Sequence, residues 1–333
     1  MPTRTSRAWE GRPLLDLASF GRRFHEAGGH LTREEVELIR RTVGRAPEAV
    51  VKVLPRGGGD LKAVGNHLAY ISRDGEVELE TDDGDPVRLT SQAALLKDWD
   101  LDLDDALRRR SAIAPTNGRV PKLAHKLMFS MPPGTPPEKV LGAVRNFARE
   151  EFWGQHRYVF ALHTDEAHPH VHLVVKAISE QGVRLNIKKA TLRHWRSEFA
   201  RNLRAIGIEA NATERAARGQ HRKAKKDGIY RAGLRGESTY INTWAGGAAT
   251  VQVGEGPSTE QGKRRLISTR RAVEGCWRSL ADLLERGGHM DLARDVRRFV
   301  GGMATPRTDR ELVRESPEYA TYGISMRDKA YSR

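Results

Sequence analysis

Cysteine and aromatic residues are both scarce in this chain. Its 333 residues include a single cysteine, Cys276, and only 6% are Phe, Trp or Tyr. One cysteine excludes an intramolecular disulfide and a zinc site built from thiolates, and it is typical of a reducing compartment. The low aromatic content argues against a binding surface made mainly of stacked rings. Chemistry based on thiols is therefore not expected.

Long apolar runs are also missing. No stretch approaches eighteen consecutive apolar residues, and the apolar segment near the N-terminus is interrupted by Asp16 and lacks a small-residue cleavage pattern. We therefore expect no membrane insertion, no signal peptide and a cytoplasmic location. The phosphate-loop pattern GxxxxGK[ST] is absent as well, so a nucleotide-driven motor is not expected.

Acidic residues are outnumbered by basic ones. The chain has 57 Lys and Arg against 43 Asp and Glu, which gives a net charge of +14, while 38% hydrophobic residues are enough for a folded core. A soluble protein with this charge is attracted to polyanions, and nucleic acid is the first candidate.

The charge is unevenly distributed along the chain. Residues 74–105 contain twelve acidic and two basic residues, and this segment is interpreted as a solvated surface. Residues 176–235 contain sixteen basic and five acidic residues, an excess that favours contacts with phosphates. The residues expected to make these contacts lie along a predicted helix and just beyond it. They are Lys188, Lys189, Arg193, Arg222, Lys223, Lys225 and Lys226.

The pattern of helix and loop signals divides the chain into four parts. Residues 1–48 are expected to form a helical N-terminal extension, in which Thr32 and Glu35 form a capping box. Residues 49–220 are expected to form the main domain. Residues 221–265 are predicted to be a basic segment followed by a linker rich in Gly and Ser, and residues 266–333 a helical C-terminal region with a helix end at Gly287.

The main domain shows strand and helix patterns in alternation. The expected strands are residues 50–54, 124–131, 158–163 and 170–178, and the expected helices cover about 61–70, 137–152 and 192–206. Residues 74–118 are expected to be irregular, with a short helix at 92–96. This pattern indicates an α+β fold.

A cluster of histidines is the most informative feature. Four of the twelve histidines lie in the segment from His163 to His172. Alternate residues of a strand project on the same face, so His170 and His172 lie side by side, and a short connection can return His163 to them. Three neutral imidazoles can hold a divalent ion with coordination positions left open. His168 lies next to Pro169 and is not expected to be a ligand, and Asp165 is placed to orient an imidazole.

The segment His163…Asp165…His168-Pro169-His170-Val171-His172, followed by an apolar strand, resembles the histidine motif of HUH endonucleases. It is most similar to relaxases of the single-tyrosine MOBP branch, to which the T-DNA border nickase belongs. The segment Asn66–Gly75 resembles the part of that family that carries the nucleophilic tyrosine, here Tyr70, and Ala212–Gly219 resembles a segment near the domain's end. In this sequence about fifty residues precede the first strand, whereas the family's tyrosine usually lies close to the chain start.

The resemblance implies a central antiparallel sheet flanked by helices, with helical additions at both ends of this chain. It implies that Tyr70 attacks a DNA phosphodiester and holds the 5′ phosphate as a phosphotyrosine. A divalent metal ion, Mg²⁺ or Mn²⁺, would be held by His163, His170 and His172 at the scissile phosphate. For Asp165, accepting a proton and orienting a histidine are both open.

The resemblance also implies the partners. These are single-stranded and hairpin DNA at a transfer origin, relaxosome accessory proteins and the coupling protein of a type IV secretion system. The protein would act in the bacterial cytoplasm and reach a recipient cell while covalently bound to DNA. Two other hypotheses stay open: a rolling-circle replication initiator or transposase with the same site, and a DNA-binding accessory protein without catalysis. The target DNA sequence and the encoding element are not predicted.

Overall fold

The computed structural model describes residues 30–54, 59–88, 92–110, 121–220 and 257–308, together with Glu311. These residues form two compact units. One unit contains residues 44–212, and the other contains residues 30–43 together with the described residues beyond 212. The basic residues Arg222, Lys223, Lys225 and Lys226 lie outside the described part of the chain.

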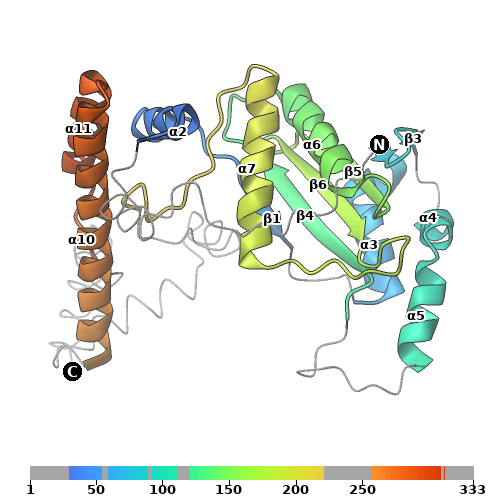
Figure 1. Cartoon of the computed structure of the whole chain (residues 1–333). Helices are drawn as coiled ribbons and strands as arrows, with labels where there is room; N and C mark the ends of the chain where they lie inside the picture. Colours follow the sequence, from blue (N-terminus) through green and yellow to red (C-terminus); the bar gives the residue numbers. More distant parts are fainter. Residues whose placement is uncertain are drawn as a thin grey trace, which may run out of the picture. The chain divides into compact units, whose positions relative to one another are not determined.

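The first unit is built on a six-stranded antiparallel sheet with the strand order β1-β4-β6-β5-β2-β3 (Figure 1). This confirms the predicted α+β class and the central antiparallel sheet. The four expected strands are present, the one at 158–163 with the expected bounds and the other three slightly shorter, and two further strands extend one edge of the sheet. The strands are β1 (Val50–Val53), β2 (Leu79–Thr81), β3 (Pro86–Val87), β4 (Ala124–Ser130), β5 (Tyr158–His163) and β6 (His170–Lys176).

Two helices, α6 (Pro137–Phe152) and α7 (Lys189–Ala205), cover one face of this sheet. Their apolar stripes meet alternate residues of β4, β5 and β6, including Phe129, Phe160 and Leu173, in the largest buried cluster. Edge-to-face packing of Phe129 on Phe199 is one of several aromatic contacts there. This face of the sheet is therefore a closed core.

The opposite face is packed by α3 (Leu61–Ser72). Asp60 caps this helix, because its carboxylate accepts a 2.7 Å hydrogen bond from the backbone N–H of Ala63. Val64, Leu68 and Ile71, at spacings of four and three, are fully buried against the apolar residues of β5 and β6. The helix is thus held firmly over the strands that carry the histidines.

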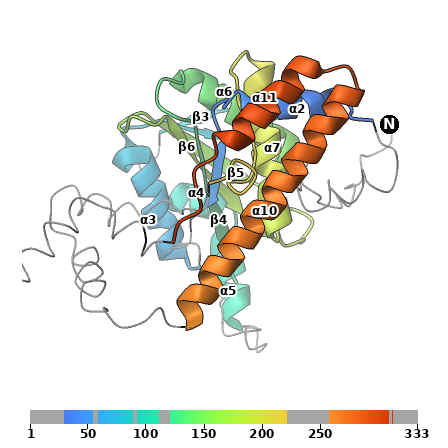
Figure 2. The same cartoon turned by 90° about the vertical axis from the view of Figure 1, so that its left-hand side faces the viewer.

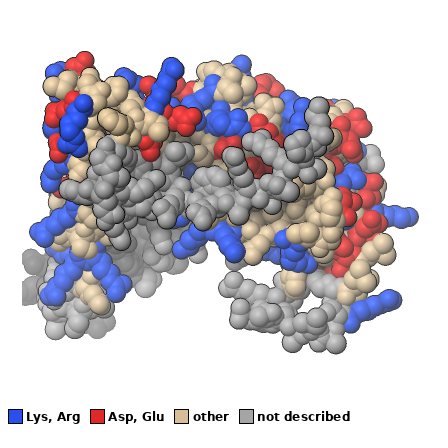
Figure 3. Space-filling model, in the orientation of Figure 1, with Lys and Arg blue, Asp and Glu red and all other residues tan. Residues whose placement is uncertain are grey.

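Residues 74–118 contain more regular structure than predicted. Besides β2 and β3, they form α4 (Gln92–Asp98) and α5 (Leu101–Arg110), of which only a shorter version of α4 was expected. The dense acidic residues obscured the apolar pattern, yet Trp99 and Leu101 are buried. The acidic side chains gather at the right-hand edge of the molecule in Figure 3, where Figure 1 places β3, α4 and α5.

Ion pairs attach this acidic segment to the sheet. Arg157 binds Asp82, Asp83 and Asp98 at 2.7, 3.3 and 3.1 Å, and Arg145 binds Glu80 through two hydrogen bonds. The acidic residues therefore form ion pairs with Arg145 of α6 and with Arg157, which directly precedes β5, in addition to forming a solvated surface.

The second unit consists of helices. Its core joins α2 (Arg33–Val43), α10 (Pro257–Arg286) and α11 (Met290–Gly301), with Ile39 and Trp277 fully buried (Figure 2). The predicted capping box is confirmed, since the backbone N–H groups of Thr32 and Glu35 each donate to the other's side chain. The predicted end at Gly287 also agrees with the structure, whereas α10 begins at Pro257, inside the segment predicted to be a linker.

No helix in the described part of the chain combines the length and the apolar character needed to cross a bilayer.

Candidate active site

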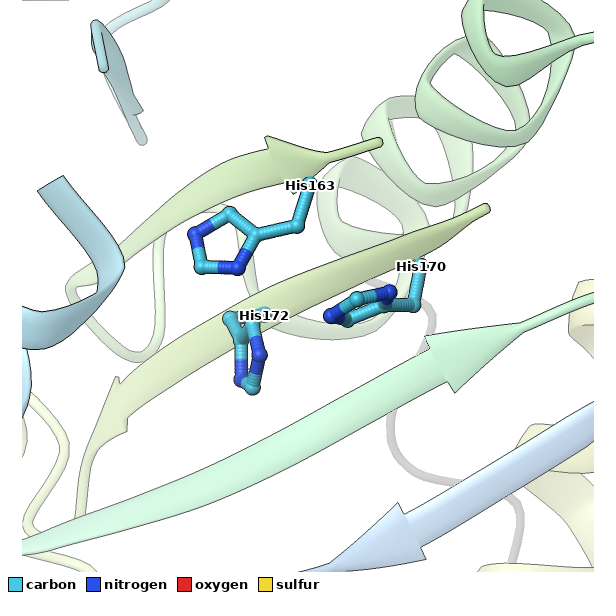
Figure 4. Close-up of side chains that lie close together, drawn as sticks. All are labelled: His163, His170 and His172. Atoms are coloured by element: carbon cyan, nitrogen blue, oxygen red, sulfur yellow. The ribbon is translucent and has the colours of Figure 1, made fainter. Parts of the chain in front are cut away.

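Three histidines meet on the face of the sheet that α3 packs against. His163 at the end of β5 pairs directly with His170 at the start of β6, and His172 lies two residues further along β6. Figure 4 shows the three rings pointing into the same space. One ring nitrogen of each lies within 4.8 Å of the others, and all three side chains are buried. In the described residues this is the one group of three or more such side chains suited to a metal ion.

The hydrogen bonds of these histidines indicate which nitrogens are free. His163 Nε2 lies 2.8 Å from the carbonyl oxygen of Ile71, and His170 Nδ1 lies 3.1 Å from that of His168. A carbonyl only accepts, so these two nitrogens carry the protons. The lone pairs are left on His163 Nδ1 and His170 Nε2, while both nitrogens of His172 lack a protein partner.

Two of the imidazoles, those of His163 and His172, have a lowered pKa and are neutral near pH 7. Burial, followed by the charges of His163 and His170, lowers the pKa of His172 to about 3. Burial also lowers the pKa of His163, against the opposing effect of its hydrogen bond to Ile71. Neutral imidazoles with unpartnered buried nitrogens fit the coordination of a divalent ion.

Tyr70 lies beside this cluster. It is near the end of α3, and its ring centroid lies 5.6 Å from that of His172 and 5.9 Å from that of His163. Its side chain is 50% exposed, which is unusual for a large side chain on a packed helix. A phenol that is open to solvent and adjacent to three buried imidazoles can reach a ligand held by them.

Two further residues, His67 and Arg73, belong to the site, although the sequence analysis did not single them out. His67 stacks near Tyr70, and its ring lies 5.7 Å from that of His172. Burial and the nearby Lys126 lower the pKa of His67 to about 4. Arg73 places its guanidinium carbon 5.3 Å from the centroid of the Tyr70 ring. The sequence did contain a signal for both residues. His67 and Arg73 each lie three positions from Tyr70, and residues three apart share a helix face.

Arg73 also binds Asp165. The Asp165 carboxylate accepts a hydrogen bond from the guanidinium, and both groups are partly exposed. Desolvation opposes ionisation of Asp165, but a backbone hydrogen bond and Arg73 outweigh it and lower the pKa of this carboxyl. Asp165 thus contacts Arg73 beside Tyr70. The sequence left open whether Asp165 accepts a proton or orients a histidine.

The backbone of Arg73 has an uncommon conformation. Its φ of 50° and ψ of 48° lie in the left-handed region, and Asp74 follows with φ 54°. Consecutive non-glycine residues in this region are strained, and such strain is concentrated at functional sites. The left-handed turn ends α3 and directs the guanidinium back over Tyr70.

Three residues predicted to contact DNA lie in the described part of the chain, and they do not join this cluster. Lys188 and Lys189 are exposed at the start of α7, and Arg193 lies on the same helix. Since α7 packs on the opposite face of the sheet from the histidine side chains, any DNA contact by these residues lies away from the cluster.

Imidazoles on two neighbouring antiparallel strands face a helix that carries a tyrosine, and this arrangement agrees with the resemblance to HUH endonucleases. Residues 81–207 match the family model described as relaxase, MobA/VirD2-like, nuclease domain. This confirms the resemblance to relaxases. Tyr70 lies before the matched residues, so its place in the site depends on the geometry above.

Curated relatives agree with this assignment. The chain is 25% identical over 198 residues to the T-DNA border endonuclease VirD2 of Rhizobium rhizogenes, and 26% identical over the same length to that of Rhizobium radiobacter. Each match covers 52% of this chain, which spans 42% and 43% of the two relatives.

A solved structure is also similar. It is the MobM relaxase domain bound to plasmid pMV158 oriT DNA in a manganese-bound crystal form. It covers 56% of this chain and 98% of its own, with 14% identity and a TM-score of 0.38.

Proposed function

We propose that this protein nicks one strand of DNA at a transfer origin and later rejoins it, through a covalent 5′-phosphotyrosine intermediate. The observation that carries the proposal is the position of Tyr70, half exposed and within 6 Å, ring to ring, of two of the three clustered histidines. The relaxase match favours this activity over a rolling-circle initiator or transposase.

In the proposed reaction, the Tyr70 hydroxyl oxygen attacks the phosphorus of the scissile phosphodiester. The bond between phosphorus and the 3′ oxygen breaks, the 5′ phosphate becomes esterified to Tyr70, and the 3′ oxygen leaves and takes up a proton from water. The proton of the phenol passes to solvent, which the exposure of Tyr70 permits. The ester retains a phosphodiester bond, so a 3′ hydroxyl can reverse the reaction.

His163, His170 and His172 would hold a divalent metal ion through their unprotonated nitrogens. Bound there, Mg²⁺ or Mn²⁺ would draw negative charge from the scissile phosphate. The protein's own contribution is to keep His163 and His172 neutral, through burial. The carbonyl groups of Ile71 and His168 fix the tautomers of His163 and His170.

Arg73 would stabilise the negative charge that develops on the phenol oxygen as the proton leaves. We expect Arg73→Gln to lower the single-turnover nicking rate at saturating DNA by roughly 10-fold, which corresponds to about 1.4 kcal/mol in the barrier. Metal affinity should be unchanged. Arg149→Gln, the same change at an exposed position of α6, is the matched control, and equal rates for the two variants would contradict this role.

The proposed DNA is single-stranded at the nick, with a hairpin or duplex beside it. Accessory proteins of a relaxosome, a type IV secretion coupling protein, a cytoplasmic location and transfer into a recipient cell while bound to DNA belong to the same proposal.

The test of the activity is covalent capture. Purified protein is mixed with end-labelled single-stranded oligonucleotides that tile candidate transfer origins, with Mg²⁺ or Mn²⁺. A labelled adduct that protease removes supports the proposal. Binding of these DNAs without any adduct would instead identify a non-catalytic DNA-binding protein.

The basic segment offers a separate test of DNA contact outside the site. Neutralising Arg222, Lys223, Lys225 and Lys226 together should weaken DNA binding and reduce the slope of log affinity against log salt. Each lost phosphate contact lowers that slope by roughly 0.9 for duplex and 0.7 for single strands. Cleavage of a short oligonucleotide with only the nick site should be nearly unchanged. An unaltered salt slope would indicate that the segment makes no DNA contact and is only a solvated surface.

A further inference from the structure

The sheet face that carries the histidines continues onto β4 and β1. His172 of β6 pairs with Met128 of β4, and Met128 pairs with Lys52 of β1. Figure 4 shows these two strands extending the sheet beside His170 and His172. Side chains two residues apart share a face, so Lys126 also projects on the histidine side. Its α-carbon lies roughly 8 Å from that of His172, from one strand spacing across and two residues along.

Lys126 is a buried cation without an acidic partner. It is 6% exposed, and no carboxylate forms an ion pair with it in the part of the chain that the structure describes. Burial, with a smaller effect from Lys122, lowers the pKa of Lys126 to about 8. Its charge also contributes to the lowered pKa of His67, which lies on α3 beside Tyr70 and His172.

A second buried lysine, Lys176, differs from Lys126 in having carboxylate partners. Lys176 on β6 is 7% exposed and lies 3.9 Å from a carboxylate oxygen of Asp104 and 3.8 Å from one of Glu180. A buried charge is costly unless a partner compensates it. Lys176 has two carboxylate partners, whereas Lys126 has none among the described residues. An anion bound at the site would compensate the charge of Lys126.

We propose that Lys126 binds a backbone phosphate of the DNA strand next to the scissile phosphate. The strand would run from the histidines across β4 toward the exposed Lys52 on β1. This inference rests on the proposed function, since it assigns part of the DNA path to that site. Phosphate oxygens accept hydrogen bonds from an ammonium group and compensate its charge, as Asp104 and Glu180 do for Lys176.

The test measures binding without nicking. A fluorescent single-stranded oligothymidylate of twenty nucleotides is titrated with protein in EDTA over a salt series. Lys126→Met should weaken binding about 5-fold or more, since a charged hydrogen bond is lost. It should also reduce the salt slope by roughly 0.7, the value for one single-strand phosphate contact. Lys126→Arg, which retains the charge, should keep the wild-type slope, as should Lys97→Met on the acidic helix α4.

Thermal unfolding without DNA separates this role from a structural one. Lys126→Met removes an uncompensated buried charge and should raise Tm, whereas Lys176→Met leaves two carboxylates without their partner and should lower it. If Lys126→Met lowered Tm, a structural role would be indicated and the inference would be wrong. Lys126→Gln provides a second variant for the binding series.

The possible failures are distinct. If wild type binds the strand and Lys126→Met has the same affinity and salt slope, this inference is wrong and the nicking proposal is unaffected. Absence of any wild-type binding to this strand would also overturn this inference, whereas the nicking proposal is tested separately by covalent capture.

Discussion

The Tyr70→Phe variant is expected to form no covalent adduct with DNA, while its affinity for the same oligonucleotide stays within a few-fold of wild type. The change removes only the attacking oxygen and keeps the ring that packs beside His163 and His172. Contacts between basic residues and phosphates, which dominate affinity, are unaffected. The measurement is gel analysis of the adduct with an oligonucleotide that wild type captures, together with an affinity titration.

Tyr158→Phe is the matched control. Tyr158 is buried on the opposite face of the sheet, among the residues of α6, and burial raises the pKa of its hydroxyl to about 12. This variant should form adduct at the wild-type level. An adduct with Tyr70→Phe would show that another tyrosine is the nucleophile. Since Tyr158 cannot reach the histidine face, Tyr230, outside the described residues, would be examined first.

The second large effect is expected from the proposed metal ligands. His170→Ala and His172→Ala should each weaken Mn²⁺ binding by at least about 100-fold, since loss of even an indirect partner of a metal ligand costs 10- to 100-fold. Nicking should be lost in both. Calorimetric titration of Mn²⁺ into each variant measures the first effect, and the adduct assay measures the second.

His168→Ala is the control for these variants. The His168 side chain is exposed, and its contribution to the site is the backbone carbonyl oxygen that accepts from His170 Nδ1, which alanine retains. Metal affinity and nicking should therefore be close to wild type. Equal losses in all three variants would refute the assignment of the ligands. Thermal unfolding of each variant shows whether removal of a buried imidazole has also unfolded the domain.

In the N-terminal extension, the sequence predicts a local feature correctly but does not predict the packing. The capping box at Thr32 and Glu35 depends on residues three apart, so the sequence predicted it correctly. The packing of α2 on α10 and α11 joins residues more than 200 positions apart, and no local pattern contains this information. For the same reason the acidic segment was predicted to be irregular, although Arg145 and Arg157 hold it to the sheet.

The sequence by itself determined the candidate site from which the function is proposed. Strand phase placed His170 and His172 on one face, because residues close in sequence have fixed geometry within a strand. The motifs around His163 and Tyr70 resemble those of relaxases. Only the tertiary structure decided that Arg73 lies over Tyr70 and binds Asp165, and that His67 joins the cluster. It also decided that, among the described residues, buried Lys126 has no acidic partner while Lys176 has two. These relations join side chains from separate elements, and the sheet register and the packing of α3 bring them together.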